Sequence, residues 1–258
     1  MALDQTTQDV ISLVEEASGR PVIVQSDPSL RLLASVKIAK GPSPAHVISY
    51  NPSVGANADY VICFQCGFIL RVFQTPEPER FDLASTWRGR NDAEKLVANQ
   101  FREAGRAMTA GGLSQIRDQM LNGLILQLRS MPIGLRVDAW LTEHYPALKD
   151  QQRAIIGRQL TENMAALSPE VKRMTPAKIF EANAGMNAAF AAFWSRCWQD
   201  MLFLQPYKAT AHADLGERLL KSWDEVPADA VHDRRLIEVW AEQVGLSSWF
   251  EFVPVLGS

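Results

Sequence analysis

Two cysteines, Cys63 and Cys66, have the spacing Cys-x-x-Cys, which makes them the first candidates for chemistry in this chain. The spacing is typical of thioredoxin-type redox pairs and of one half of a structural zinc site. A redox pair needs its first cysteine partly exposed at a helix N-terminus, whereas both of these lie inside an apolar run. A structural zinc site needs a second pair of ligands, and the third cysteine, Cys197, is far along the chain. We therefore expect buried thiols that pack as small hydrophobic groups.

The four histidines are the next candidates, and they are widely scattered, at His46, His144, His212 and His232. His212 and His232 each lie close to an aspartate, so either could contribute to a site, although residues at a solvated helix start are the commoner case. The sequence contains neither a Gly-x-Ser-x-Gly motif nor a glycine-rich phosphate loop. A Ser/His/Asp hydrolase stays open as an alternative, because the members of such a triad converge only in space.

A predicted strand, loop and helix between His46 and Phe73 carry the most specific pattern. The segment begins His-Val-Ile-Ser-Tyr-Asn-Pro and continues, after a short loop, as Ala-Asp-Tyr-Val-Ile-Cys-Phe-Gln-Cys-Gly-Phe-Ile-Leu-Arg. It resembles the ImmA/IrrE-like zinc metallopeptidases, in which a strand ending in Tyr-Asn precedes a helix with the motif His-Glu-Leu-Gly-His. Further on, Ala98-Asn99-Gln100-Phe101 resembles the later family helix that supplies the third zinc ligand. The resemblance covers residues 5–105, under half of the chain.

The residues that make this motif diagnostic are replaced. Phe64 and Phe68 stand at the two histidine positions, Gln65 at the glutamate, and Lys95 at the third ligand, with Glu94 one residue away. In the family, two histidines four residues apart hold one zinc ion and the glutamate acts as its general base. Phenylalanine has no lone pair, glutamine cannot accept the proton, and lysine repels a metal ion.

The resemblance therefore implies a metallopeptidase-like scaffold with no metal, no cofactor and no catalytic residue. Its old cleft would comprise Phe64, Gln65, Phe68, Glu94 and Lys95. If the resemblance does not hold, Phe64 and Phe68 are a packing pair on the apolar face of a core helix. Both interpretations leave the site without zinc.

The resemblance also implies a function, because members of the family commonly act on DNA-binding regulators in mobile elements and stress responses. The leading hypothesis is a non-catalytic protein-binding or regulatory module, with a protein partner, in a bacterial regulator or phage-defence system. The first alternative is a hydrolase whose site lies elsewhere, for instance between the two parts of the chain.

The second alternative is a nucleic-acid-associated subunit that uses the basic stretch from Arg71 to Arg106. Its phosphate contacts would be Arg71, Arg88, Arg90 and Arg102. Acidic residues in the same stretch nearly cancel this charge, which favours a solvated, salt-bridged face.

Composition excludes several classes of protein. The 258 residues, 47% of them hydrophobic, are enough for a sizeable core. A formal charge of −3 argues against a dedicated nucleic-acid binder, and three cysteines cannot form a disulfide framework. The acidic N-terminus lacks the features of a secretory signal, and polar residues interrupt the apolar stretch 186–204. We expect a cytoplasmic protein with no membrane span. The sequence leaves open whether the protein forms a homo-oligomer.

The elements that would position these residues form an α+β protein. We expect a helix over 4–18, strands near 21–25, 31–40 and 45–51, and a buried helix over 58–73. Gly19 is the expected stop of the first helix. The remaining residues are predicted to form helices near 91–109, 113–130, 134–144, 150–166, 176–204, 212–222 and 230–244. The predicted breaks between these helices include Gly111-Gly112 and Met131-Pro132. The alternating, apolar end from Ser247 to Leu256 should dock on its own body.

This organisation predicts two units. Residues 1–110 would form the metallopeptidase-like α+β head, and residues 111–258 a helical body. The two could pack as one unit.

Overall fold

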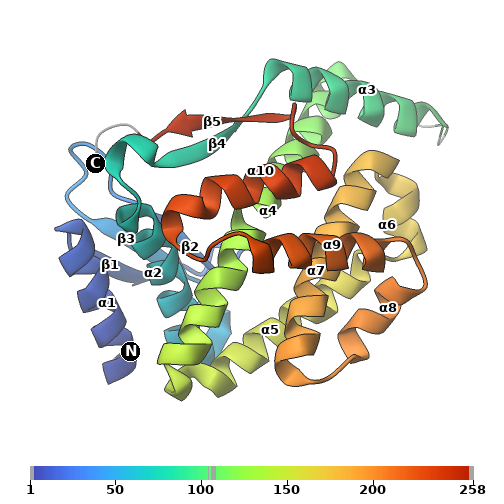
Figure 1. The fold of residues 1–258 in the computed structure, drawn as a ribbon. Helices are drawn as coiled ribbons and strands as arrows, with labels where there is room; N and C mark the ends of the chain where they lie inside the picture. The colour runs from blue at the N-terminus through green and yellow to red at the C-terminus, as the bar shows by residue number, and fades with distance from the viewer. Residues whose placement is uncertain (1–2, 104, 106–108, 256–258) are drawn as a thin grey trace.

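The computed structural model of the chain describes residues 3–103, 105 and 109–255, and Figure 1 shows its fold. The N-terminal part consists of α1 (Gln5–Ser18), the strands β1 (Val22–Ser26), β2 (Ala34–Lys37) and β3 (His46–Tyr50), and α2 (Ala58–Gln74). Almost everything that follows is helical. The predicted α+β class and the order helix, three strands, helix are both confirmed.

The three strands form one sheet in the order β1-β3-β2, in which β3 pairs parallel with β1 and antiparallel with β2. β2 is therefore an edge strand. Helices α1 and α2 pack against each other and against the sheet, with the side chains of Val10, Val14 and Ile48 fully buried between them. Asp4 caps α1 by accepting a hydrogen bond from the Thr7 amide, and Gly19 ends the helix with a φ of 67°, as predicted.

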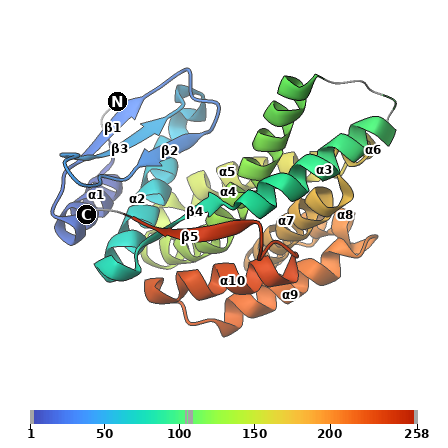
Figure 2. The same cartoon turned by 90° about the horizontal axis from the view of Figure 1, so that it is seen from above.

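The helical body surrounds one central helix. Its elements are α3 (Trp87–Glu103), α4 (Ala110–His144), α5 (Lys149–Ala165), α6 (Pro169–Met174), α7 (Ala177–Trp198), α8 (Gln205–Lys208), α9 (His212–Glu225) and α10 (Asp233–Gln243). Short 3-10 helices cover Pro52–Asn57, Glu77–Glu79, Pro146–Leu148, Leu202–Leu204 and Ala230–His232. Helix α7 is buried on almost all sides, because α4, α5 and α9 all pack on it (Figure 2).

Two predicted breaks in the helical body are wrong. Pro132 does not end a helix but lies inside α4, which runs without interruption from Ala110 to His144. The proline removes the backbone donor that would bond the Leu128 carbonyl, and its own carbonyl accepts a hydrogen bond of 3.1 Å from the Trp223 indole. Gly111 and Gly112 are not a stop either. They form the first turn of α4, where the Thr109 hydroxyl accepts from the Gly112 amide.

Several predicted ends are also corrected. The second strand is shorter than the expected range 31–40, and α3 begins at Trp87 rather than near residue 91. Helix α7 stops at Trp198, because Gln199 turns the chain with a φ of 54°, so the predicted helix over 176–204 is too long. Residues 104 and 106–108 and residues 256–258 lie outside the described residues, and with them Arg106 and Leu256.

A second, two-stranded sheet joins the C-terminal segment to the strand that precedes α3. β5 (Phe250–Pro254) pairs antiparallel with β4 (Phe81–Ser85), with Leu83 opposite Phe252. This pairing confirms that the apolar C-terminal segment docks on its own body. β4 belongs to the predicted unit 1–110 and β5 to 111–258. Because α2 also packs on α4 and α5, buried side chains from both ranges form one core cluster.

Helix α2 is apolar enough to raise the question of a membrane span. Among the described residues the segment Pro52–Gln74 alone passes a test of length and composition, with a mean hydropathy of 1.2. In the structure 56% of that window is buried inside the protein, and α2 packs on α1, α4 and the sheet. We describe it as a core helix.

The crossing of α2 over α4 depends on a glycine. A Cβ atom placed on Gly67 would lie 2.3 Å from Cγ1 of Val137. We expect Gly67→Ala to lower the free energy of unfolding by about 1–3 kcal/mol, because the two helices must separate to accept the methyl group. Chemical denaturation measures this. Gly157→Ala in α5 is the matched control, since nothing lies within 4 Å of its Cβ position. Equal effects of the two changes would contradict the close approach.

Candidate functional site

The structure contains a large cleft above helix α2, with a volume of about 1110 Å³. We call it the α2 cleft. Its floor is the face of α2 that carries Tyr60, Phe64 and Phe68. One wall is formed by β2 and the loop after it, the other by α4 and α5 through Leu126, Ile133 and Ile155, and Phe81 of β4 lies at one end.

Three of the five residues predicted for the old cleft line it together. Phe64, Gln65 and Phe68 all belong to the floor. The rings of Phe64 and Phe68 meet edge to face with centroids 5.3 Å apart, and Phe64 also packs on Tyr60. Gly134 of α4 makes room for this group, because a Cβ atom there would lie 3.2 Å from the ring of Phe64. The two phenylalanines are thus a packing pair and at the same time the surface of a cleft.

The other two predicted residues, Glu94 and Lys95, do not line the α2 cleft. Both belong to α3, which leaves β4 and packs on α4. Glu94 forms an ion pair with Arg117, which also contacts Asp118, while Lys95 is exposed. The sequence-based grouping of these five residues is therefore corrected, since the chain turns away from the cleft after β4.

Cys63 and Cys66 are packing groups, as expected from their apolar surroundings, whereas Cys197 is exposed. Cys63 and Cys66 are fully buried and not bonded to each other, and Cys63 lies 3.6 Å from the Thr7 hydroxyl. Burial raises the pKa of the Cys63 thiol to about 12 and also raises the pKa of Cys66. Within the described residues no three His, Cys, Asp or Glu side chains come together as a metal-binding group. Phe64 and Phe68 likewise offer no ligand for zinc, because phenylalanine has no lone pair.

The lining of the α2 cleft carries more positive than negative charge. Its ionised side chains are Lys37, Lys40, Arg71, Arg80 and Arg129 against Asp82 and Asp233. Asp82 lies between Lys40, at 3.6 Å, and Arg129, at 3.0 Å. The excess of cations makes the cleft electropositive in a protein whose formal net charge is −3.

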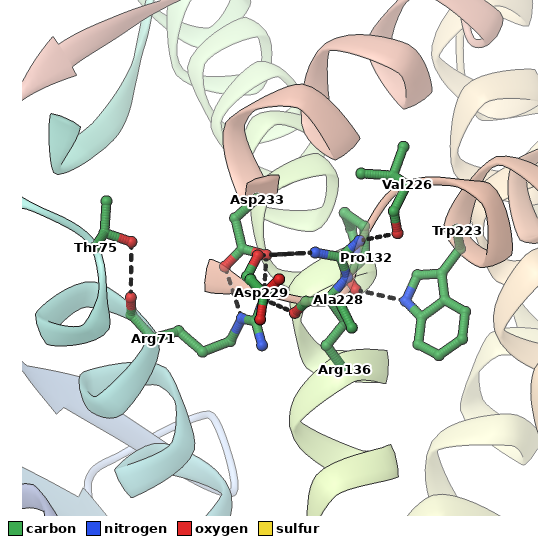
Figure 3. Close-up of polar contacts among 9 residues, drawn as sticks. All are labelled: Arg71, Thr75, Pro132, Arg136, Trp223, Val226, Ala228, Asp229 and Asp233. Carbon is green, nitrogen blue, oxygen red and sulfur yellow. Dashed lines mark hydrogen bonds and ion pairs between the residues drawn. The ribbon is translucent and has the colours of Figure 1, made fainter. Parts of the chain in front are cut away.

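One end of the cleft is closed by a buried ion-pair cluster, drawn in Figure 3. Arg71 of α2 binds both carboxylate oxygens of Asp233, at 2.7 and 2.6 Å, and Arg136 of α4 binds one of them at 3.2 Å. The two guanidinium groups also donate to backbone carbonyls, Arg71 to Ala228 at 2.8 Å and Arg136 to Val226 at 2.9 Å. Burial lowers the pKa of Arg136. The cluster ties α2 and α4 to the start of α10.

A second buried polar group lies behind the floor. The Tyr60 hydroxyl donates to Oδ1 of Asp138 at 2.7 Å, and the Gln152 amide donates to the same atom at 3.2 Å. Asp138 is only 1% exposed, and burial raises its pKa to about 7. The sequence analysis did not single out any of these three residues. Only the packing of α2 on α4 and α5 brings them together.

The predicted nucleic-acid contacts do not share one surface. Arg71 is held in the ion-pair cluster of the cleft, whereas Arg88, Arg90 and Arg102 lie on α3. There, Arg88 is 3.9 Å from Asp92, Arg90 binds Ser85, and Arg102 binds Asn99. A phosphate backbone could not contact all four at once without breaking the pair of Arg71 with Asp233.

The arrangement of the α2 cleft suits binding more than proton transfer, because its floor is aromatic and its charged groups are paired or basic. Function is inferred here from this geometry. Compared with protein-family models, with curated proteins and with solved structures, the chain matches none of them.

Proposed function

We propose that this protein is a non-catalytic binding module, of regulatory type, whose α2 cleft holds an extended, acidic segment of a protein partner. The observation that carries the proposal is the free edge of β2, which forms one wall of the cleft opposite an aromatic floor. An exposed strand edge next to apolar pockets is the arrangement that recognises extended peptides by adding a strand to the sheet.

The register of β2 places unpaired backbone groups toward the cleft. The Asn51 amide donates to the Leu33 carbonyl at 2.9 Å, which makes these two residues a hydrogen-bonded pair of the antiparallel ladder. Such pairs alternate, so the backbone groups of Ala34 and Val36 point to the open side. A partner strand could pair with them over two successive hydrogen-bonded positions.

The side chains of the cleft indicate the chemistry of the partner. Phe64 and Phe68 offer apolar contact area to every second residue of a bound strand, while the cations of the lining attract carboxylates. The replacement of both histidines and the glutamate by Phe64, Phe68 and Gln65 supports holding the segment without cleaving it. These features together favour an acidic peptide with alternating apolar residues.

Fluorescence anisotropy with short labelled peptides tests the proposal. A peptide that alternates valine with glutamate should bind, and the same peptide with lysine in place of glutamate should bind at least about ten-fold more weakly, since the cleft repels its charges. Methylation of alternate backbone nitrogens of the acidic peptide should abolish binding, because it removes the donors that pair with β2. Equal binding of all three peptides, or of none, would refute the proposal.

A variant of the protein provides the matching test. Lys37 is exposed on β2 and lines the cleft, so Lys37→Glu should weaken binding of the acidic peptide about five-fold, the equivalent of about 1 kcal/mol for one exposed charge pair. Lys208→Glu, on the exposed surface of α8 and outside the cleft lining, is the control and should leave the affinity unchanged.

A further inference from the structure

A second cavity, of about 610 Å³, lies between α4, α5, α6 and α7, next to the α2 cleft. We call it the amide cavity, because its polar side chains are mostly amides, among them Gln127, Asn163, Asn183 and Asn187. Its volume falls within the range of small-molecule sites. Leu126 and Val171 also line it and are 52% and 38% exposed, so the cavity reaches the surface.

Three of the amides form a closed ring of hydrogen bonds. Gln127 donates to Asn187 at 2.8 Å, Asn187 donates to Asn183 at 3.1 Å, and Asn183 donates back to Gln127 at 2.7 Å. Each group uses one N–H and one oxygen lone pair in the ring. An amide has two of each, so every member keeps one donor and one acceptor for a further partner. The structure shows no other hydrogen bond of these side chains among the described residues.

One more amide of the lining has an unused hydrogen-bond donor. Nδ2 of Asn163, which also lines the cavity, is buried from solvent and has no hydrogen-bond partner among the described residues. Burial of an unsatisfied donor is unfavourable, so this amide gains a hydrogen bond if its side chain rotates toward a ligand in the cavity.

The lining of the amide cavity has almost no charged groups, which limits the chemical class of ligand that it could bind. Among the described residues the amide cavity contains no Lys, Arg or His side chain, and its one ionisable group is the buried Asp138. Such a site offers nothing to balance a phosphate or carboxylate. Phe180 and Phe190 add aromatic side chains to the same lining. A neutral, flat molecule with donors and acceptors along its edge matches this combination.

We propose that the amide cavity binds a nucleobase in the form of a free base or nucleoside, without a phosphate group. Asn and Gln side chains pair with the donor and acceptor edges of bases, and aromatic rings stack on their faces. The cavity shares Phe64, Leu126, Ser130 and Gln159 with the α2 cleft, but the amide ring lies outside that cleft, and the inference does not depend on the function proposed for the cleft.

Isothermal titration calorimetry with adenosine, guanosine, cytidine and uridine tests this inference. At least one nucleoside should bind with a Kd below about 1 mM, and its 5′-monophosphate should bind several-fold more weakly because the lining lacks a cation. Binding of none of the four, or tighter binding of the monophosphate, would overturn the proposal.

Two variants locate the site. Gly123 lines the cavity at an exposed position and has nothing within 4 Å of its Cβ position, so Gly123→Leu should narrow the mouth of the cavity and weaken nucleoside binding in a folded protein. Gln127→Leu opens the amide ring and should weaken binding at least ten-fold. Asn122→Leu, at an exposed position of α4 outside the lining, is the control and should leave the Kd unchanged. Unchanged binding in both cavity variants would refute the assignment.

Discussion

Replacing Asp233 by alanine should lower the free energy of unfolding by about 3–5 kcal/mol, the largest effect expected of a single change in this protein. Asp233 is the shared partner of Arg71 and Arg136, whose side chains are 13% and 3% exposed. Without the carboxylate two guanidinium groups remain side by side in a poorly solvated environment, repelling each other. Chemical denaturation at neutral pH measures the loss.

A surface ion pair provides the control for this prediction. Asp224 binds Arg196 through two hydrogen bonds, at 2.8 and 3.1 Å, but both side chains are nearly half exposed. Asp224→Ala removes the same chemical group from a solvated site and should lower stability by less than about 1 kcal/mol. If Asp233→Ala has no larger effect than Asp224→Ala, the cluster does not hold α2, α4 and α10 together as described.

The second large effect is a change in the pH dependence of stability through Asp138. The pKa of its carboxyl group in the folded protein, about 7, is above the ordinary value of 3.8, so between these pH values the folded protein keeps a proton that the unfolded chain has released. The stability of the parent should therefore fall as the pH rises from about 4 to about 7, and then stay level. A shift of about three units corresponds to a free energy on the order of 4 kcal/mol.

Asp138→Asn should remove this dependence. The amide oxygen can still accept the hydrogen bond from Tyr60, but the side chain carries no charge at any pH. At about pH 8 we expect the variant to be more stable than the parent, and at about pH 4 the difference should shrink towards zero. Urea denaturation across this range measures both. The comparison of parent and variant cancels the contributions of buried histidines such as His46.

An exposed aspartate serves as the control for the pH experiment. Asp150 lies on the surface of α5, and Asp150→Asn should keep the slope of the parent. If Asp138→Asn shows the same pH dependence as the parent, the buried carboxyl group is not the source of it. Loss of stability in Asp138→Asn at about pH 8 would show that the ionised carboxylate is better accommodated than its burial implies.

Helix α2 shows how far local sequence could predict the candidate site. The segment from Ala58 to Phe73 is apolar at nearly every position, which indicates a buried helix, and the structure has that helix over Ala58–Gln74. The same run predicts buried cysteines and an aromatic face with Phe64 and Phe68. These properties follow from helical periodicity, because residues three or four apart share a face. The location of Glu94 and Lys95 relative to that face depends on the path of the chain after β4, which periodicity does not describe.

The sequence by itself determined the α+β class, the stop of α1 at Gly19, the buried thiols of Cys63 and Cys66 and the aromatic floor, since each depends on residues close together in the chain. Only the tertiary structure decided what surrounds them. Asp233 binds Arg71, 162 positions earlier in the chain, and Arg136, 97 positions earlier. Strand β4 pairs with β5, which lies near the C-terminal end. The carbonyl of Pro132 in α4 likewise accepts a hydrogen bond from the distant Trp223. Such contacts leave no periodic signal in either segment, because their free energy comes from burial and charge pairing between surfaces that meet only in the folded state.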